Sequence, residues 1–438
     1  MKSLSVTSLL IASLLLKVLL SYFIPVFGDE TYYYIWSLHP QLSYFDHPPM
    51  VSWFIYLGHL ILPAGNPISL RISFILAGVG IALIWVAILR MKHYSERQIF
   101  LWLVLFFLNP LLGIGSLLAT PDTPLVLFWS LSFLGFLKIL NSNSLKWYAL
   151  TGVFLGLGFC SKYHIVLFVV SGLIYLLISK KWKTLRPAGI FMTVFFGAIF
   201  SGPVIVWNAQ NNWSSFLFQI NHGFGEDSFE WAWPAGYLVA QILIISPVIV
   251  FSFFQRSIAS IDKTFSISQI GFFFLSSFKS VVEGNWPLTS HLHSISYFSE
   301  SAQSKFFKYS VFYWLIFYGL VVGFLCSPFS EPVKKNLVNS SQLVEVVPLL
   351  GEYSPLFGAS YQVASLLSWQ TQKNIPKLSG LSRLDFYDSL PDSEPTTASF
   401  YVLKYDISDW PANYQLYKKI KIRSFDNISL GLYQFIYE

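Results

Sequence analysis

The chain has 438 residues, of which 54% are hydrophobic and only 11% are charged, whereas a soluble domain carries about 25% charged residues. With a mean hydropathy of +0.56, this composition excludes an ordinary soluble globular protein and indicates an integral membrane protein. The net charge of +6 does not indicate nucleic-acid binding, because the cations lie largely in short loops of the kind that orient membrane proteins. Two cysteines, Cys160 and Cys326, are too few for a disulfide framework or a zinc motif.

The first predicted element is an apolar run over residues 4–27, which we interpret as an uncleaved membrane-spanning helix rather than a signal peptide. The run is about 20 residues long, enough to cross a bilayer, and no small-residue cleavage site precedes Gly28. Further apolar runs predict a polytopic α-helical membrane protein with about eleven spans. These runs cover residues 67–89, 98–118, 124–140, 147–161, 163–179, 187–207, 237–254, 266–282, 287–302 and 309–326.

Lysine and arginine are concentrated in the loops on one side of the predicted spans, which the positive-inside rule makes cytoplasmic. They are Arg90, Lys92, Arg97, Lys138, Lys146, Lys180, Lys181, Lys183, Arg186, Arg256, Lys263, Lys305 and Lys308. The opposite, outer side holds mainly acids, with Arg71, Lys162 and Lys279 as cations that depart from this bias. The acids are Asp29, Glu30, Asp46, Asp122, Glu226, Asp227, Glu230 and Glu283.

Two domains are expected. Residues 1–326 contain the spans and a first outer loop at about 28–66, in which W-F-I-Y-L-G-H-L-I-L predicts a short interfacial helix. Residues 327–438 are polar and rich in turns, and the alternating runs S-F-Y-V-L-K-Y, Y-Q-L-Y-K-K-I-K-I and L-G-L-Y-Q-F-I-Y predict strands. Together with the helical stretch Y-Q-V-A-S-L-L-S-W-Q, these strands indicate a small α/β domain on the outer side.

Three short motifs place acids on the outer side. G-D-E-T-Y-Y-Y carries Asp29 and Glu30, Y-F-D-H-P-P-M carries Asp46 and His47, and A-T-P-D-T-P carries Asp122. The prolines stiffen the last two segments, because proline fixes its own φ and restricts the residue before it. A plainer explanation stays open for each acid, since a carboxylate at a span end is often a solvated boundary residue and an aspartate beside proline often forms a turn.

Two further motifs place cations on the same side. C-S-K-Y-H carries Lys162, and F-K-S-V-V-E-G-N-W-P carries Lys279 together with Glu283, Asn285 and Trp286. A lysine at membrane depth is costly unless it is paired or faces a cavity, so these lysines suggest a bound anion such as a phosphate. The alternative is that each lysine extends to the interface with its stem in the apolar region.

The separated aspartates also suggest a divalent metal. Carboxylate oxygens are the ligands preferred by Mg²⁺ and Mn²⁺, and His47 would admit Zn²⁺. The candidate ligands are the separated aspartates, Asp46 and Asp122 among them, and His47, although Asp46 could equally form a structural turn.

In this order, the motifs resemble those of the GT-C membrane glycosyltransferases. The most similar branch is the bacterial one related to protein O-mannosyltransferases (PMT) and lipid A aminoarabinose transferases. The resemblance rests on G-D-E-T-Y-Y, Y-F-D-H-P-P, A-T-P-D-T-P, G-L-G-F-C-S-K-Y-H and V-E-G-N-W-P, within residues 1–300, and extends weakly through the tail. It implies a GT-C transmembrane domain that binds a lipid-phosphate sugar in an outward-facing cavity.

The resemblance also implies roles for individual residues. Asp29 would be the general base on the acceptor hydroxyl, with Glu30 as the neighbouring acid that shapes the catalytic site, and Asp46 and Asp122 would bind the metal. Lys162 matches a lysine that contacts the lipid phosphate, whereas His47 stands where that branch has a lysine. The expected phosphate contacts are therefore Lys162, Lys279 and His47, and the expected cavity residues are Tyr33, Tyr44, Glu283, Asn285 and Trp286.

These implications define the expected function. The protein would be an inverting glycosyltransferase of the bacterial inner membrane that moves a sugar from a polyprenyl-phosphate donor to a lipid, glycan or protein hydroxyl on the periplasmic side. One alternative is a transporter or lipid flippase, which would require ionisable groups buried within spans, where Lys17 is the one clear candidate. Another alternative is a polytopic scaffold, which would tolerate changes at Asp29, Asp46 and Asp122.

Overall fold

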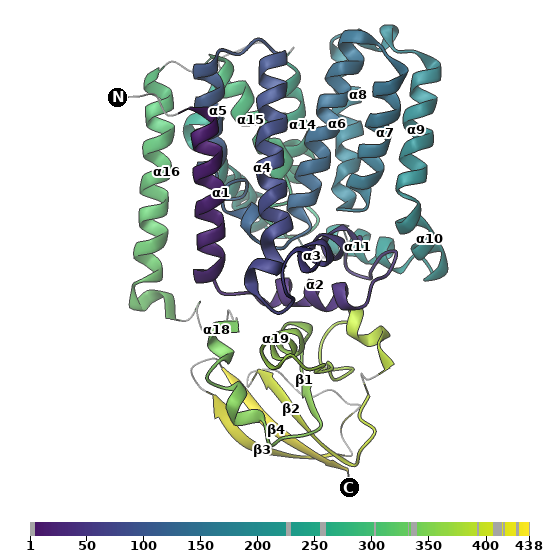
Figure 1. Cartoon of the computed structure of the whole chain (residues 1–438), viewed down its shortest axis with the longest axis vertical. Coiled ribbons are helices and arrows are strands. Elements are labelled where there is room, and N and C mark those ends of the chain that lie inside the picture. The colour runs from purple at the N-terminus through teal and green to yellow at the C-terminus, as the bar shows by residue number, and fades with distance from the viewer. Residues whose placement is uncertain are drawn as a thin grey trace. The chain divides into compact units, whose positions relative to one another are not determined.

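A computed structural model shows a mainly helical chain with a small C-terminal sheet (Figure 1). The structure describes residues 5–224, 229–254, 260–301, 304–331, 333, 340–391, 394–405, 414, 417–425 and 429–437. Glu226, Asp227 and Arg256, which entered the orientation argument, lie outside the described residues.

The chain separates into two compact units, and each is described by itself. The helical unit comprises Met1–Leu19, Leu42–Val51 and Ile72–Tyr318, and the mixed unit comprises Leu20–Gln41, Ser52–Arg71 and Gly319–Glu438. This division differs from the expected boundary after residue 326, because most of the first outer loop belongs to the same unit as the C-terminal sheet.

The helical unit is a bundle of long helices (Figure 1). Helix α7 packs against α6 and α9, α14 packs against α8 and α15, and α15 packs against α5. The bounds are α1 (Val6–Phe23), α4 (Pro67–Met91), α5 (Glu96–Leu108), α6 (Asp122–Ser142), α7 (Leu145–Phe159), α8 (Val166–Ile178), α9 (Pro187–Phe200), α10 (Gly202–Gln210), α11 (Ser214–Phe224), α12 (Ala232–Ile245), α13 (Pro247–Ser252), α14 (Ile261–Ser276), α15 (Leu288–Ser301) and α16 (Ser304–Leu325). Helices α1, α4 and α16 extend beyond this unit along the chain.

Several of these helices are suited to a bilayer. Among the described residues, α1, α4, α6 and Lys305–Leu325 are long and apolar enough to span, and α9 with α10 would add a fifth span that is bent by 53°. Shorter apolar helices include α7, α12 and Tyr163–Ile178. A polytopic helical membrane protein is therefore confirmed in kind, while the count of about eleven spans stays a prediction.

Helix α15 differs from the apolar span predicted over residues 287–302. Many of its polar side chains are buried inside the bundle, namely Thr289, Ser290, His291, His293, Ser294, Ser296 and Ser299. His291 lies 3.2 Å from Gln241, and His293 lies 3.0 Å from Asp262 and 2.9 Å from the indole nitrogen of Trp129. These partners satisfy the two histidines, which favours their burial, whereas the hydroxyls of Ser290 and Ser299 are buried without a hydrogen-bond partner.

The mixed unit has a four-stranded sheet in the order β1-β2-β4-β3, with β1 and β2 parallel and the other neighbours antiparallel. Strands β2 and β4 have the predicted limits, β3 begins a few residues later than predicted, and the three-residue β1 was not predicted. The α/β character of the tail is thus confirmed. The elements of this unit are α2 (Gly28–Leu38), most of α3 (Met50–Ile61), α18 (Ser340–Leu343), β1 (Leu356–Gly358), α19 (Tyr361–Thr371), β2 (Ser399–Tyr405), β3 (Tyr417–Phe425) and β4 (Leu430–Tyr437).

Candidate active site

The predicted site residues fall in both units. Asp29, Glu30 and Tyr33 belong to the mixed unit, and the other candidates belong to the helical unit. The latter are Tyr44, Asp46, His47, Asp122, Lys162, Lys279, Glu283, Asn285 and Trp286.

Helix α2 begins at Gly28, so Asp29 and Glu30 lie in its first turn, where the helix dipole favours negative charge. A side chain at position 28 would not fit, because a Cβ there would lie 2.8 Å from the Cβ of Gln362 on α19. The glycine therefore allows close packing of α2 on α19, and this packing determines where the two acids lie.

Glu30 is buried and fully engaged. Arg71 donates to its two carboxylate oxygens over 2.8 Å and 2.6 Å, and the backbone N–H of Phe27 donates to it over 3.2 Å. The exposed fractions of the Arg71 and Glu30 side chains are 0% and 2%. The remaining N–H groups of Arg71 donate to the carbonyls of Ser21, Ile24 and Pro25.

Both oxygens of Glu30 accept hydrogen bonds from a buried guanidinium, so Glu30 holds the start of α2 in position. This agrees with the expected role of Glu30 as the neighbouring acid that shapes the catalytic site, and that role stays a prediction. The sequence marked Arg71 as an unexpected outer cation, but no short-range pattern indicated its partner, which lies 41 positions earlier in the chain.

Asp29 contrasts with its neighbour because its side chain is exposed. Its carboxylate accepts a hydrogen bond of 3.2 Å from the hydroxyl of Tyr361, the first residue of α19. The guanidinium of Arg383 lies 5.1 Å from the centre of the Tyr361 ring, within the range of a cation–π interaction. Sequence analysis missed Tyr361 and Arg383, since neither stands in a recognisable motif.

Tyr33 is not an exposed wall residue. Its ring is buried and packs edge-on against Trp36, with 5.0 Å between ring centres. The consecutive tyrosines of α2 therefore contribute to the interior of the mixed unit, and a place for Tyr33 in a substrate cavity stays a prediction.

In the helical unit, three of the sequence motifs meet at Asp122. Lys162 donates to one Asp122 oxygen over 2.7 Å, and the side-chain amide of Asn285 donates to the other over 2.7 Å. Asp122 begins α6, Lys162 lies in the turn after α7, and Asn285 lies between α14 and α15. We call these three residues the Asp122 cluster. Its lysine is buried but its ammonium group has three N–H donors, one of which binds Asp122.

Among the remaining candidates of this unit, His47 lies within electrostatic range of His164, as Lys162 does. Tyr44 is fully buried and Asp46 is also buried, and their roles in a substrate cavity and a metal site stay predictions. Gln219 donates to the backbone carbonyl of Asp46 over 2.6 Å. The ring of Trp286 lies 5.6 Å from that of His164. His47 is half-buried, whereas Lys279 and Glu283 are exposed.

The arrangement as it stands does not fit a metal ion. Within the part of the chain that the structure describes, no group of three His, Cys, Asp or Glu side chains lies close enough together to hold one. Each oxygen of Asp122 accepts one hydrogen bond, from Lys162 or from Asn285. The divalent ion predicted at Asp46, His47 and Asp122 stays a prediction, and no step below depends on it.

Comparisons with known proteins agree with the motifs. The sequence model of the dolichyl-phosphate-mannose-protein mannosyltransferase family matches residues 46–207, a range that includes Asp46, Asp122 and Lys162. The solved structure of ArnT from Cupriavidus metallidurans bound to undecaprenyl phosphate superposes with a TM-score of 0.68 at 12% identity, covering 98% of this chain and 97% of ArnT. This chain is therefore similar in sequence to that family over residues 46–207 and similar in fold to ArnT. The apo structure of the same ArnT gives a TM-score of 0.67.

The chain also resembles a curated protein, the lipid A galacturonosyltransferase RgtD of Rhizobium johnstonii. It is 22% identical over 239 residues, which are 52% of this chain and 48% of RgtD. The chain therefore spans about half the length of that relative. At 12% identity, the likeness to ArnT establishes a shared fold alone.

Proposed function

We propose that this protein is an integral-membrane glycosyltransferase that moves a sugar from a polyprenyl-phosphate donor to an acceptor hydroxyl. The observation that carries the proposal is the contrast between two adjacent acids. Glu30 is buried in an ion pair, whereas Asp29 is exposed, oriented by Tyr361 and placed at a helix start. A carboxylate held in this way is suited to receive a proton from a substrate.

In the proposed reaction, the acceptor oxygen attacks the anomeric carbon while its proton passes to the Asp29 carboxylate. The bond between that carbon and the phosphate oxygen breaks, and its electron pair leaves with the polyprenyl phosphate. Direct displacement inverts the configuration at the anomeric carbon. A carboxylate within hydrogen-bond reach of the acceptor hydroxyl can take its proton as general base.

The Asp122 cluster has a separate role in the proposal. The leaving phosphate carries negative charge, and a fixed cation that offsets this charge lowers the barrier. Lys162 is held by Asp122 over 2.7 Å and has further N–H groups with which to bind phosphate oxygens. Asn285 donates to the other oxygen of Asp122. This bond fixes the orientation of the Asp122 carboxylate, which in turn positions the Lys162 ammonium group.

Names of related proteins suggest the substrate classes. ArnT was crystallised with undecaprenyl phosphate, which supports a polyprenyl-linked donor, and RgtD is named for action on lipid A, which supports a lipid acceptor. A different glycan or a protein remains an alternative acceptor. We further propose that the reaction takes place on the periplasmic side of the inner membrane, as the distribution of cations in the sequence predicts.

The test is Asp29→Asn, assayed by mass spectrometry of envelope glycolipids from a deletion strain that carries each variant. We expect the transferred sugar to disappear while the protein is still present in the membrane. Glu352→Gln, which changes another exposed acid of the mixed unit, is the matched control and should leave the sugar unchanged. Undiminished transfer by Asp29→Asn would show that Asp29 is not the base.

A transporter is the second candidate, because the helical unit contains a buried charged network. Asp262 is fully buried and contacts both Lys92 and His293, and the α9–α10 pair is bent by 53°, a break of the kind found in transporters. Purified protein in liposomes separates the two functions. Movement of a lipid-linked sugar across the bilayer without glycosyl transfer would favour a transporter.

A further inference from the structure

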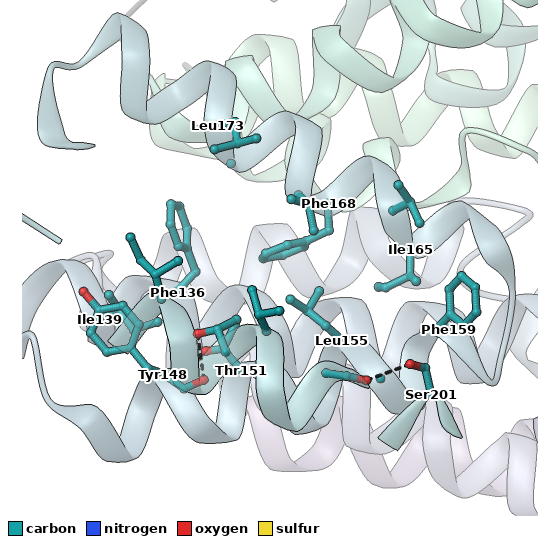
Figure 2. Close-up of a pocket in the computed structure, with 18 of the residues that line it drawn as sticks. Phe136, Ile139, Tyr148, Thr151, Leu155, Phe159, Ile165, Phe168, Leu173 and Ser201 are labelled. Atoms are coloured by element: carbon teal, nitrogen blue, oxygen red, sulfur yellow. Dashed lines mark hydrogen bonds between the residues drawn. The ribbon is translucent and has the colours of Figure 1, made fainter. Parts of the chain in front are cut away.

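Two features of the structure have no part in the proposed reaction as described so far. One is a cavity of about 390 Å³ between helices α6, α7, α8 and α9, and Figure 2 shows Phe136, Leu155 and Phe168 directed into it. The lining residues that the structure describes include no charged side chain, so the cavity adds no acid, base or cation to the site. The other feature is a charged loop of the mixed unit, which contacts the hydrogen-bond partner of Asp29.

This loop covers residues 377–389, and we call it the Lys377 loop. The ammonium group of Lys377 is 0% exposed and donates to Asp385 over 2.8 Å and to Asp388 over 2.5 Å. It also donates to the backbone carbonyl of Arg383 over 3.1 Å. An ammonium group has three N–H donors, and these three bonds use all of them within the loop. The buried cluster therefore fixes the backbone at Arg383.

The Lys377 loop is also bonded to helix α2. The backbone N–H of Phe386 donates to the hydroxyl of Tyr32 over 2.8 Å, and the rings of Tyr32 and Tyr387 stack with 6.1 Å between their centres. Tyr32 is buried and lies three residues after Asp29 on the same helix, and residues three apart are neighbours on a helix surface. The loop is therefore held against the part of α2 that carries Asp29.

Two contacts hold the ring of Tyr361, whose hydroxyl donates to Asp29. The ring centre of Tyr32 lies 4.4 Å from that of Tyr361, and the guanidinium of Arg383 lies 5.1 Å from it, within the range of a cation–π interaction. Arg383 is exposed, but one of its N–H groups donates to the carbonyl of Leu384 over 3.1 Å, which restricts the direction of its side chain. A ring held in this way keeps its hydroxyl in place, 3.2 Å from a carboxylate oxygen of Asp29.

We propose that the Lys377 loop positions the general base, with Arg383 as the positioning residue. Arg383 holds the Tyr361 ring so that its hydroxyl stays bonded to Asp29, and it does not itself touch the reacting atoms. This inference rests on the proposed function and adds a residue on which the reaction depends indirectly. The position of the base matters because a misplacement of about 1 Å can remove a large part of the rate.

The test is a double-mutant cycle of Arg383→Gln and Tyr361→Phe in the deletion strain, which supplies its own donor and acceptor. The measured quantity is the initial rate at which the sugar appears on envelope glycolipids after induction, divided by the amount of full-length protein in the membrane. We expect Tyr361→Phe to lower this rate about tenfold, the scale of a hydrogen bond to a charged group. Arg383→Gln should lower it about fivefold, the scale of an exposed cation–π contact.

The double variant separates positioning from direct contact with a substrate. Adding Arg383→Gln to Tyr361→Phe should change the rate less than about twofold, because the hydrogen bond that Arg383 holds is already lost. Such non-additivity is expected of residues that act together. Arg383→Lys keeps a cation that can lie over the ring and should recover part of the rate lost in Arg383→Gln.

The control for this cycle is Arg423→Gln. Arg423 is an exposed arginine of the same unit, and its guanidinium lies 5.6 Å from the ring centre of Phe425 on β3. The substitution removes the same kind of ring contact at a place away from α2 and α19, so the rate should stay within about twofold of the wild type.

Two outcomes would overturn the inference. An unchanged rate for Arg383→Gln, with transfer abolished by Asp29→Asn, would show that the loop does not position the base, while the proposed function would stand. A fivefold loss that persists in the Tyr361→Phe protein would mean that Arg383 acts independently of the tyrosine, as a direct contact to an anionic group of a substrate would. If Asp29→Asn transfers normally, the proposed base itself is wrong, and this inference falls with it.

Discussion

One carboxylate–cation pair in each unit can be compared, and the two pairs differ in how many donors of the cation are occupied. The Glu30–Arg71 pair is bidentate and sealed from solvent, with side-chain exposures of 2% and 0%. The Asp122–Lys162 pair joins through one hydrogen bond of 2.7 Å and keeps exposures of 16% and 11%. A pair with every donor occupied can only support the fold, whereas a pair with donors left over can also bind a ligand.

The largest effect is expected from Arg71→Met. This change leaves Glu30 buried without its cation, and breaking a buried pair from one side costs about 3–5 kcal/mol. Thermal unfolding of the purified protein should show a large loss of stability. Arg90→Met, which breaks the exposed Arg90–Glu96 pair with exposures of 56% and 66%, should show no measurable change. An equal loss of thermal stability in the two variants would mean that burial does not determine how much these ion pairs contribute to stability.

Lys162→Met is expected to reduce transfer more than stability. Loss of a positioned group that offsets transition-state charge typically lowers kcat about 10²–10³-fold. Transfer from a defined polyprenyl-phosphate sugar should fall by this amount, and Lys162→Arg should restore part of it because the charge is kept. Two results together would contradict this prediction: Lys162→Met lowers stability as much as Arg71→Met does, and the Lys162→Met protein that remains folded transfers sugar at the normal rate. The Asp122–Lys162 pair would then have the same structural role as the Glu30–Arg71 pair.

A third buried cluster, in the mixed unit, has more carboxylates than cations. In the mixed unit, the buried Lys377 donates to Asp385 over 2.8 Å and to Asp388 over 2.5 Å, so one cation faces two carboxylates. Burial raises the pKa of Asp385 to about 6, against the opposing effect of Lys377. The folded state therefore holds this proton more tightly than the unfolded chain, whose aspartate pKa is about 3.9.

This difference predicts a pH dependence of stability. The protonated Asp385 contributes about 2–3 kcal/mol to the free energy of unfolding. This contribution is complete below about pH 4 and is lost as the pH rises through about 6. Unfolding of the wild type at pH 4.5 and 7 should show this loss, and Asp385→Asn should remove it. If the variant and the wild type have the same pH profile, Asp385 is ionised throughout the range.

The smallest effect is expected from Asn285→Ala. It removes the amide that donates to Asp122, and a hydrogen bond to a charged group contributes about 1.5–3 kcal/mol. Transfer should fall about tenfold, less than for Lys162→Met, since the cation remains. Asn285→Gln, which keeps the amide group, is the control for side-chain chemistry. A loss equal to that of Lys162→Met would make Asn285 a direct substrate contact.

How much the sequence predicted depended on the range of the interaction. Strands β2 and β4 followed from runs of alternating character of eight residues or fewer, whereas α2 was not predicted, because residues 28–66 were expected to begin as an outer loop. The sequence also placed Asp122, Lys162 and Asn285 on one side of the membrane, because charge and span length determine sidedness. It could not predict that they form one cluster, since the Lys162 and Asn285 bonds to Asp122 cross 40 and 163 positions.

Tertiary partners can override a local pattern. The resemblance implied Tyr33 and Tyr44 as cavity residues, and the structure shows both side chains buried by packing, so that role stays a prediction. Residues 287–302 were predicted as an apolar span, but α15 buries polar side chains, and its two histidines bond to residues of other helices. Tyr361 could not be linked to Asp29 from local sequence, because 332 positions separate them.

The polar face of α15 has a consequence for how the protein is made. A helix with so many serine, threonine and histidine side chains gains little from entering lipid alone. Its bonding partners Trp129, Gln241, Asp262 and Gln269 all precede it in the chain, so they are synthesised before it leaves the ribosome. We expect α15 to enter the membrane late in biogenesis, by packing against these four side chains in helices that are already inserted.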